Sequence, residues 1–120
     1  MLKNILLVGL GGAAGTMLRY AFSVWFKYVS FPIATFLVNI IGSFIIGAVF
    51  AYALRSEQFA NNWRLFLAAG ICGGFTTFSA FSLESLAMLQ QQRIGMFALY
   101  VGASILLGLT ATWLGYSLVK

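Results

Sequence analysis

The chain has 120 residues, of which 62% are hydrophobic and only 8% are charged, and it contains no histidine. A soluble domain usually carries roughly 25% charged residues, so this chain could not cover its apolar surface with polar groups. The composition excludes a soluble protein and indicates an integral membrane protein. The net charge of +5 comes from scattered lysines and arginines without a basic cluster, so it does not indicate nucleic-acid binding.

The charged residues divide the chain into four apolar segments, each about as long as the ~17–25 residues that a membrane-spanning helix needs. We predict an all-α fold with spans at about 4–26, 32–54, 63–90 and 95–118, in one domain. A secretory signal peptide is not expected, because the first segment is too long and too rich in glycine. One side of the membrane holds four positive charges and the other two or three, which is a weak positive-inside bias. Single topology and insertion in both orientations therefore both stay open.

The first span combines a glycine motif with a charged residue inside the apolar segment. Gly11 and Gly15 form a G-x-x-x-G pair, which predicts the close approach of another helix. Arg19 lies deep in the same segment, where a charge is costly unless it reaches the interface or a polar cavity. Arg19 is therefore either a residue that extends to the membrane surface or a positive charge at the entrance of an anion pathway.

The second span starts with a proline, which helices accept in their first turn. Asn39, Ser43 and Gly47 then recur at every fourth residue, so they share one helix face. A carboxamide inside a membrane needs hydrogen-bond partners. Asn39 is therefore either a link between helices or a donor that lines a pore.

The third span is the most unusual segment of the chain. Residues 70–82 contain three glycines, four hydroxyl side chains and three phenylalanines. Glycine inside a helix costs about 1 kcal/mol relative to alanine, and serine and threonine compete for backbone hydrogen bonds. We predict a helix that is interrupted at mid-membrane, where backbone polar groups must face protein, an ion or a water-filled path. Phe78 and Phe81, three residues apart, project to one side of it.

Two further residues of this span carry reactive groups. Glu84 is the only acidic residue inside a span, which makes it either a candidate functional acid or the partner of an arginine near the interface. Cys72 is the only cysteine, so the chain has no intramolecular disulfide, and we interpret it as a small packing residue.

The fourth span carries a stripe of small and polar residues. Tyr100, Ser104, Gly108 and Thr112 follow one another at intervals of four and share one face. Taken alone, the stripe fits helix packing as well as an ion path. Beside an interrupted helix and a second polar stripe, a path is the better interpretation.

The residue types exclude most enzymatic chemistry and favour a passive path for a small anion. No histidine, nucleophile–base pair, metal-binding cluster or nucleotide-binding motif is present, so an enzyme is not expected. A conducting site must bind an ion and also release it, which favours neutral donors and the positive edges of phenyl rings over deep lysines. Backbone carbonyls freed at the interruption could hold a cation. The neutral donors are those of Asn39, Thr76, Thr77, Ser79, Tyr100, Ser104 and Thr112.

Three blocks of the sequence, 11–20, 38–44 and 73–84, resemble the Fluc (CrcB-type) fluoride channels, and the resemblance extends over essentially the whole chain. It implies an antiparallel, dual-topology homodimer in the bacterial inner membrane. It also implies two pores per dimer that conduct fluoride passively out of the cytoplasm and so limit its toxicity.

The resemblance also assigns roles to residues. Phe78 and Phe81 are similar to the pore phenylalanines of the family, and Asn39 and Ser79 to its pore-side polar residues. Thr77 belongs to the same hydroxyl cluster. At two further positions, Gly73 and Thr76, the backbone carbonyls match the family's ligands of a sodium ion at the dimer interface.

The last helix and the two charged residues extend this correspondence. Tyr100 and Ser104 resemble the start of a polar track, and either Thr110 or Thr112 continues it. Arg19 matches the arginine that ends the first-helix motif, and Glu84 the glutamate that closes the third block. The chain departs from the family pattern at two positions. Ala80 stands where a hydroxyl residue is usual, and Ala34 stands where a glycine is usual.

Two other classes of protein fit part of the pattern. A small multidrug or cation exporter also has four spans and often dual topology, but it would need an acidic residue deep in its first span, which here has none. A subunit that only assembles with other proteins would leave the cluster of hydroxyls and phenylalanines unexplained.

Overall fold

The computed structural model describes residues 1–27 and 31–120, with the side chain of Asn62 left out. The described ranges contain helices and no strands. Four helical segments are long and apolar enough to cross a membrane: Leu2–Trp25, Ile33–Arg55, Leu65–Gln90 and Ile94–Val119. These bounds lie close to the predicted ones, which confirms the prediction of an all-helical chain with four candidate spans. The chain is a multi-pass membrane protein.

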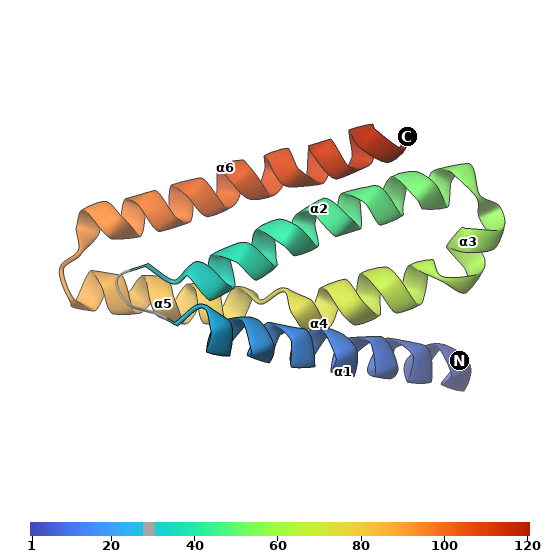
Figure 1. Ribbon diagram of the computed structural model, residues 1–120, viewed down its shortest axis with the longest axis horizontal. Helices are drawn as coiled ribbons and strands as arrows, with labels where there is room; N and C mark the ends of the chain where they lie inside the picture. The colour runs from blue at the N-terminus through green and yellow to red at the C-terminus, as the bar shows by residue number, and fades with distance from the viewer. Residues whose placement is uncertain (28–30) are drawn as a thin grey trace.

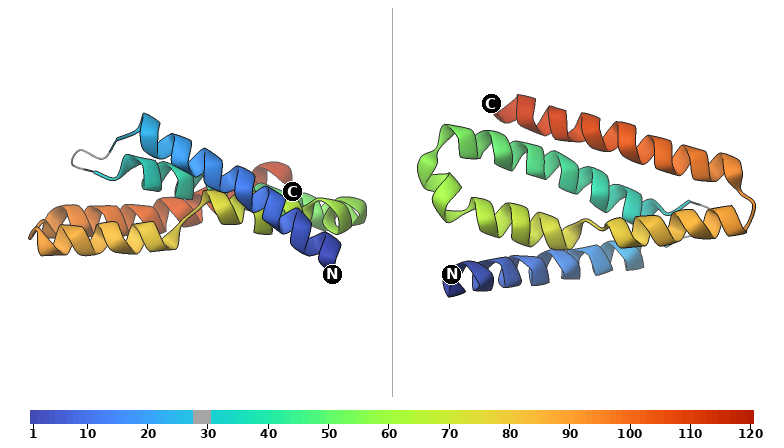
Figure 2. Two further views of the ribbon diagram at one scale, coloured as in Figure 1. Left: turned by 90° about the horizontal axis from the view of Figure 1, so that it is seen from below. Right: turned by 180° about the vertical axis from the view of Figure 1, so that it is seen from behind.

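The first, second and fourth spans are single helices, α1 (Leu2–Trp25), α2 (Ile33–Arg55) and α6 (Ile94–Val119). Figure 1 shows α2 lying along α6 on one side and the third span lying along α1 on the other. In the view from below, α1 crosses the other helices at an angle (Figure 2). The helix α2 begins directly after the buried Pro32, as expected for a proline at a helix start.

Glycines bring the helices into backbone contact at two places. A Cβ atom on Gly11 would lie only 2.6 Å from the carbonyl oxygen of Phe66, and both Gly11 and Gly15 are buried. This confirms the close helix packing that the G-x-x-x-G pair predicts. A Cβ atom on Gly115 of α6 would overlap the carbonyl oxygen of Phe44 on α2. Both contacts therefore depend on the absence of a side chain.

The third span consists of three helical pieces. A π-helix (Leu65–Cys72) leads into one helical turn, α4 (Gly73–Phe75), and a longer helix, α5 (Phe78–Gln90), follows. The two residues between α4 and α5 have extended backbones, with φ −85° and ψ 159° at Thr76 and φ −151° and ψ 121° at Thr77. The sequence did not predict the π-helix, because periodicity does not distinguish i→i+5 from i→i+4 hydrogen bonding in such an apolar segment.

The polar connection between the second and third spans also contains a helix. This helix, α3 (Glu57–Asn62), begins after Ser56, whose Oγ accepts a hydrogen bond from the backbone N–H of Phe59 at 3.2 Å. Serine at the N-cap and an acidic residue in the first turn are typical of a helix start and explain this short element.

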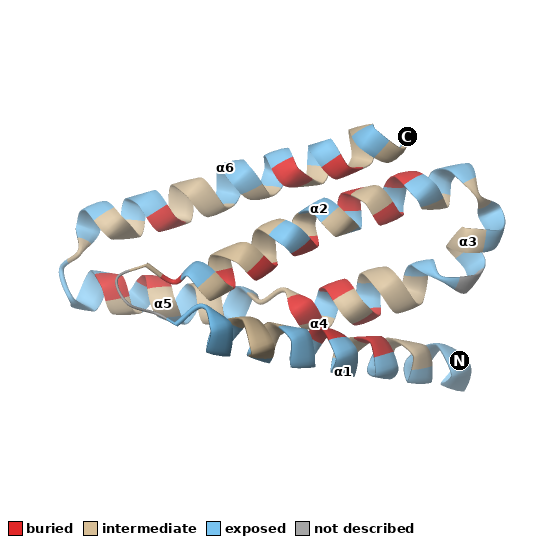
Figure 3. Ribbon diagram, viewed as in Figure 1, coloured by how far each residue is buried: buried red, intermediate tan, exposed pale blue. Residues whose placement is uncertain are grey.

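Few residues are buried within the single chain. Buried positions lie where helices face one another, while most of the outward surface is exposed (Figure 3). Large apolar side chains cover much of that outer surface, including Leu106 and Leu109, each 68% exposed. Apolar exposure on this scale fits contact with lipid or with other membrane-embedded protein surfaces.

Candidate functional site

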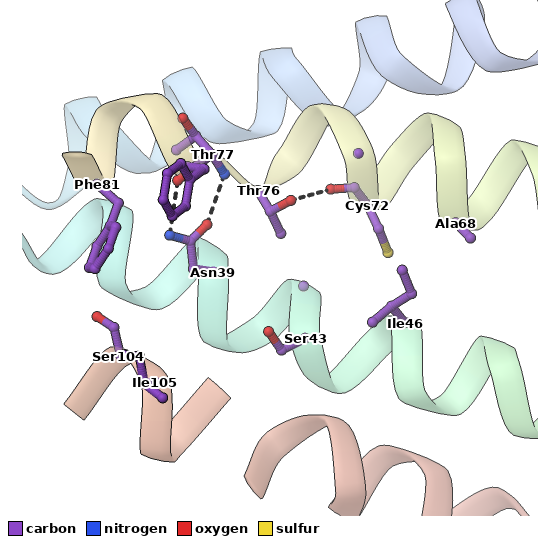
Figure 4. Close-up of a pocket in the computed structure, with 13 residues that line it drawn as sticks. Asn39, Ser43, Ile46, Ala68, Cys72, Thr76, Thr77, Phe81, Ser104 and Ile105 are labelled. Atoms are coloured by element: carbon purple, nitrogen blue, oxygen red, sulfur yellow. Dashed lines mark hydrogen bonds between the residues drawn. The ribbon is translucent and has the colours of Figure 1, made fainter. Parts of the chain in front are cut away.

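A hollow of about 390 Å³ lies beside the interruption of the third span. Its walls come from α2, the π-helix, α4, α5 and α6, together with the two extended threonines, and α1 contributes no lining residue (Figure 4). None of the thirteen lining residues is a lysine, an arginine or a carboxylate. The hollow brings together seven of the site residues that the sequence predicts, namely Asn39, Gly73, Thr76, Thr77, Phe78, Phe81 and Ser104.

Asn39 is paired with the backbone of Thr77. Its Oδ1 accepts from the Thr77 N–H at 2.8 Å, and its Nδ2 donates to the Thr77 carbonyl at 3.1 Å (Figure 4). The Asn39 Oδ1 thus replaces the helical acceptor that the Thr77 N–H has lost. Of the two interpretations of Asn39, the link between helices is present in the structure. Because Nδ2 carries two hydrogens and Asn39 also lines the hollow, the link leaves a second donor on this residue.

The interruption frees two particular backbone carbonyls. In an uninterrupted helix the Gly73 carbonyl would accept from the Thr77 N–H, but that N–H donates to Asn39. The Thr76 carbonyl would accept from the Ala80 N–H, but that group donates to the Thr77 Oγ1 at 3.2 Å. Side chains therefore take both donors away from Gly73 and Thr76.

The hydroxyls at the interruption are also engaged locally. Thr77 occupies the N-cap of α5, and its Oγ1 lies 3.4 Å from the Oγ of Ser79. The Oγ1 of Thr76 donates to the Cys72 carbonyl at 2.8 Å. Ser79 is exposed and does not line the hollow. Cys72 is buried, as its interpretation as a packing residue expected.

Three aromatic rings follow one another from the outer surface to the interior. Phe78 is 77% exposed, and its ring centroid lies 5.7 Å from that of Phe81. The Phe81 ring in turn lies 5.0 Å from the ring of Tyr100, which is fully buried. The planes of both pairs are tilted, at 46° and 50°, so ring edges as well as faces are presented toward neighbouring groups.

Glu84 is held by two hydroxyl groups. Its Oε2 accepts from Thr35 Oγ1 and its Oε1 accepts from Tyr100 Oη, each at 2.9 Å. A pairing of Glu84 with an arginine was one of its two interpretations, and no such ion pair occurs among the described residues. Tyr100 therefore directs its hydroxyl to Glu84. The sequence pattern did not lead us to predict Thr35 as a polar partner at this site. Its position four residues before Asn39, on the same face of α2, is the signal that could have identified it.

The polar stripe on α6 divides between two hollows. Ser104 lines the first hollow, and its Oγ is buried without a hydrogen-bond partner among the described residues. Thr112 lines a second hollow of about 470 Å³ between α2 and α6, while Thr110 is exposed. Both threonines donate to the carbonyl four residues earlier. Ile46 lines both hollows, so they adjoin.

Arg19 lies on the other side of the interrupted span. Its Nε donates to the carbonyl oxygen of Gly74 at 3.1 Å, and the residue is half-buried. Arg19 does not line the hollow. The sequence did not predict this contact, because neither interpretation of Arg19 involved the backbone of another span.

Comparison with known proteins identifies the family. Residues 6–116 match the family model described as "CrcB-like protein, Camphor Resistance (CrcB)". The chain belongs to the CrcB family. A CrcB relative from Flavobacterium psychrophilum, named fluoride-specific ion channel FluC, is 43% identical over 99% of this chain and 98% of its own length. Proteins of the same name from Thermus thermophilus and Azobacteroides pseudotrichonymphae are 44% and 40% identical, over 97% and 100% of this chain and 93% and 98% of their own lengths.

Proposed function

We propose that this CrcB protein is a fluoride-selective ion channel and not an enzyme, and that it conducts fluoride passively out of the cytoplasm. The observation that carries the proposal is the identity of 40–44% to relatives named fluoride-specific ion channels over nearly the whole chain. The two departures from the family pattern, Ala34 and Ala80, lie outside the lining of the hollow, so they leave its donors in place.

The chemistry of the hollow supports an anion that is bound weakly and released quickly. Its lining offers the Phe81 ring, the second hydrogen of the Asn39 amide and the buried Ser104 hydroxyl. This hydroxyl has no hydrogen-bond partner among the residues that the structure describes. A buried donor without a partner is costly, so an anion in the hollow would relieve that cost. The absence of lysine and arginine from the lining means that a bound fluoride would meet no full positive charge that could trap it.

Two copies of the chain in opposite orientations form the proposed channel, with two pores. The exposure of Phe78, at 77%, supports a second copy, because an aromatic side chain next to the hollow is available to complete a pore wall with its partner. The weak charge bias allows insertion in both orientations. Ser79 is exposed beside Phe78 and would face the same interface, and Thr112 would extend the path through the adjoining hollow. We place the dimer in the bacterial inner membrane.

A sodium ion at the dimer interface belongs to the same proposal. The residues fit it, because Gly73 and Thr76 have carbonyl oxygens whose helical donors are diverted to side chains, and hard cations prefer oxygen ligands. Those two carbonyls would hold the ion, which would supply a fixed positive charge that stabilises the interrupted backbone. The chain itself supplies the scaffold, because Asn39 and Thr77 keep the competing N–H groups away from these oxygens.

Fluoride efflux from liposomes tests the proposal. Purified protein is reconstituted with internal potassium fluoride, efflux is started with a potassium ionophore, and external fluoride is followed with an electrode. We expect rapid fluoride release and negligible chloride release from matched chloride-loaded liposomes. Efflux that requires a proton or sodium gradient would identify a coupled exporter instead. No efflux from folded dimers would refute the channel.

A further inference from the structure

We propose that Arg19 is a positioning residue, which holds the interrupted span against α1 through its hydrogen bond to the Gly74 carbonyl. This inference rests on the proposed channel function for its flux measurement, but not for its structural measurement. It assigns to Arg19 a role different from that of a charge that attracts anions.

The Gly74 carbonyl needs a partner because of the interruption. In an uninterrupted helix it would accept from the N–H of Phe78, but Phe78 begins a new helix after two extended residues. The Nε of Arg19 lies 3.1 Å from this oxygen and donates to it. A charged donor makes a stronger hydrogen bond than a neutral one, and a half-buried carbonyl without a partner would be destabilising.

Arg19 belongs to a row of α1 residues that contacts the same short segment. Gly12 and Gly15 bring the α1 backbone against α4, since a Cβ on Gly74 would lie 3.0 Å from the Gly12 Cα and a Cβ on Gly15 would lie 2.7 Å from the backbone nitrogen of Phe75. Phe22 meets the buried Phe75 ring edge to face, with centroids 5.4 Å apart. The spacing of this row places all its members on one face of α1, and they are Gly12, Gly15, Arg19 and Phe22.

The position of Arg19 separates it from the proposed path. No residue of α1 lines the hollow, which lies toward α2 and α6. The two glutamates do not pair with Arg19 either, since Glu84 accepts from two hydroxyls and Glu57 lies in α3, outside the four spans. The polar atom that Arg19 contacts is therefore a backbone oxygen at the interruption, on the face away from the hollow.

Two substitutions separate the hydrogen bond from the charge. In Arg19→Gln, the amide nitrogen stands the same number of bonds from Cα as the arginine Nε, so the donor is kept and the charge is lost. In Arg19→Lys, the charge is kept, but a methylene group occupies the place of Nε. The positioning role predicts that glutamine replaces arginine better than lysine does, and a role in attracting anions predicts the opposite order.

Two measurements are made on each variant. The first is amide hydrogen exchange in the purified dimer, compared between residues 73–81 and residues 100–110 of α6. We expect Arg19→Lys to exchange about tenfold faster at 73–81 with α6 unchanged, and Arg19→Gln to stay within about threefold of wild type. The second is fluoride efflux at low and high ionic strength. We expect Arg19→Lys to conduct more slowly than Arg19→Gln, and we expect the ratio of the two rates to be the same at both ionic strengths.

Arg55 provides the matched control. Its Nη1 donates to the Val119 carbonyl at 2.7 Å, which is also an arginine–backbone contact, but it lies exposed and far from the interruption in the chain. We expect Arg55→Lys to leave exchange at 73–81 and fluoride efflux unchanged.

The outcomes distinguish the two ideas. Loss of protection at 73–81 in Arg19→Lys but not in Arg19→Gln, with α6 unchanged, would support the positioning role. Equal loss in both variants would contradict it, because Arg19→Gln keeps the donor. Wild-type exchange in both variants would overturn it, as would efflux that is slow only in Arg19→Gln and recovers at high ionic strength. If the wild-type protein releases no fluoride, the channel proposal fails, while the exchange comparison still decides the role of Arg19.

Discussion

This protein has two long helix contacts, one between α2 and α6 and one between α1 and the third span. Glycines bring the backbones together in both contacts, but only in the second are free backbone groups bound by side chains. In the contact between α2 and α6, both helices are uninterrupted, and Gly47 and Gly115 let the backbones touch. In the contact between α1 and the third span, Gly11 and Gly15 do the same, but the partner is interrupted and its free backbone groups are bound by side chains.

The difference indicates that the α2–α6 contact and the interrupted third span have different roles. The α2–α6 pair keeps its backbone hydrogen bonds within each helix, so it can act as a rigid support. The third span gives up helical hydrogen bonds at Thr76 and Thr77 and is stabilised instead by Asn39 on one side and Arg19 on the other. Such a segment presents backbone oxygens inside a membrane at low cost, which a continuous helix cannot do. Four substitutions test this difference: three affect the interruption or its partner Asn39, and one affects the contact between α2 and α6.

The largest expected effect is that of Phe81→Ile. The Phe81 ring lines the hollow and contacts the rings of Phe78 and Tyr100. Isoleucine keeps most of the volume but has no ring edge to attract an anion. We expect fluoride efflux to fall to the leak of protein-free liposomes, while size-exclusion chromatography still gives the dimer. Phe59→Ile in α3, outside the four spans, is the control and should conduct normally. Wild-type efflux from Phe81→Ile would remove the ring from the path.

Asn39→Asp should have the next largest effect. Aspartate keeps an acceptor for the Thr77 N–H but places a carboxylate oxygen opposite the Thr77 carbonyl, where the amide now donates. The lost hydrogen bond costs about 1–3 kcal/mol, so we expect efflux to fall by roughly tenfold to a hundredfold. The carboxylate would also repel an anion in the hollow. Normal efflux would show that the Asn39 amide is not needed at the interruption.

Gly115→Ala tests the contact between α2 and α6 instead. The new Cβ would overlap the Phe44 carbonyl oxygen, and neither backbone can move without separating α2 from α6. We expect the free energy of unfolding to fall by about 1–3 kcal/mol, with efflux per folded dimer unchanged. Gly102→Ala on the same helix is the control, because no atom lies within 4 Å of the place that its new methyl group would take, and it should gain about 0.5–1 kcal/mol. Equal stabilities for the two variants would contradict the contact.

The sequence could predict the four spans and one of the two glycine contacts, but only part of the interruption. Length and hydropathy are sufficient to place the four spans, and G-x-x-x-G spacing is sufficient to predict the contact of Gly11 and Gly15. The partners of the interrupted segment are different, because Arg19, Asn39 and Gly74 lie on three separate spans. Their contacts depend on how the helices pack, which no local pattern encodes. For the same reason, the pattern could not show that Glu84 accepts from two hydroxyls instead of pairing with an arginine.

The smallest expected effect is that of Thr77→Ala, and it separates the two functions of this residue. The Thr77 backbone is held by Asn39, whereas its Oγ1 caps α5 by accepting from the Ala80 N–H. Alanine removes only the cap, at a cost of about 1 kcal/mol, and Thr77→Ser keeps it. Without the cap, the Ala80 N–H is released and can compete for the Thr76 carbonyl. We therefore expect a small loss of thermal stability in Thr77→Ala, but a larger decrease in the stabilisation that added sodium gives, with Thr77→Ser close to wild type in both. A sodium effect that is the same in all three proteins would contradict the idea that Thr77 keeps this carbonyl free for a cation.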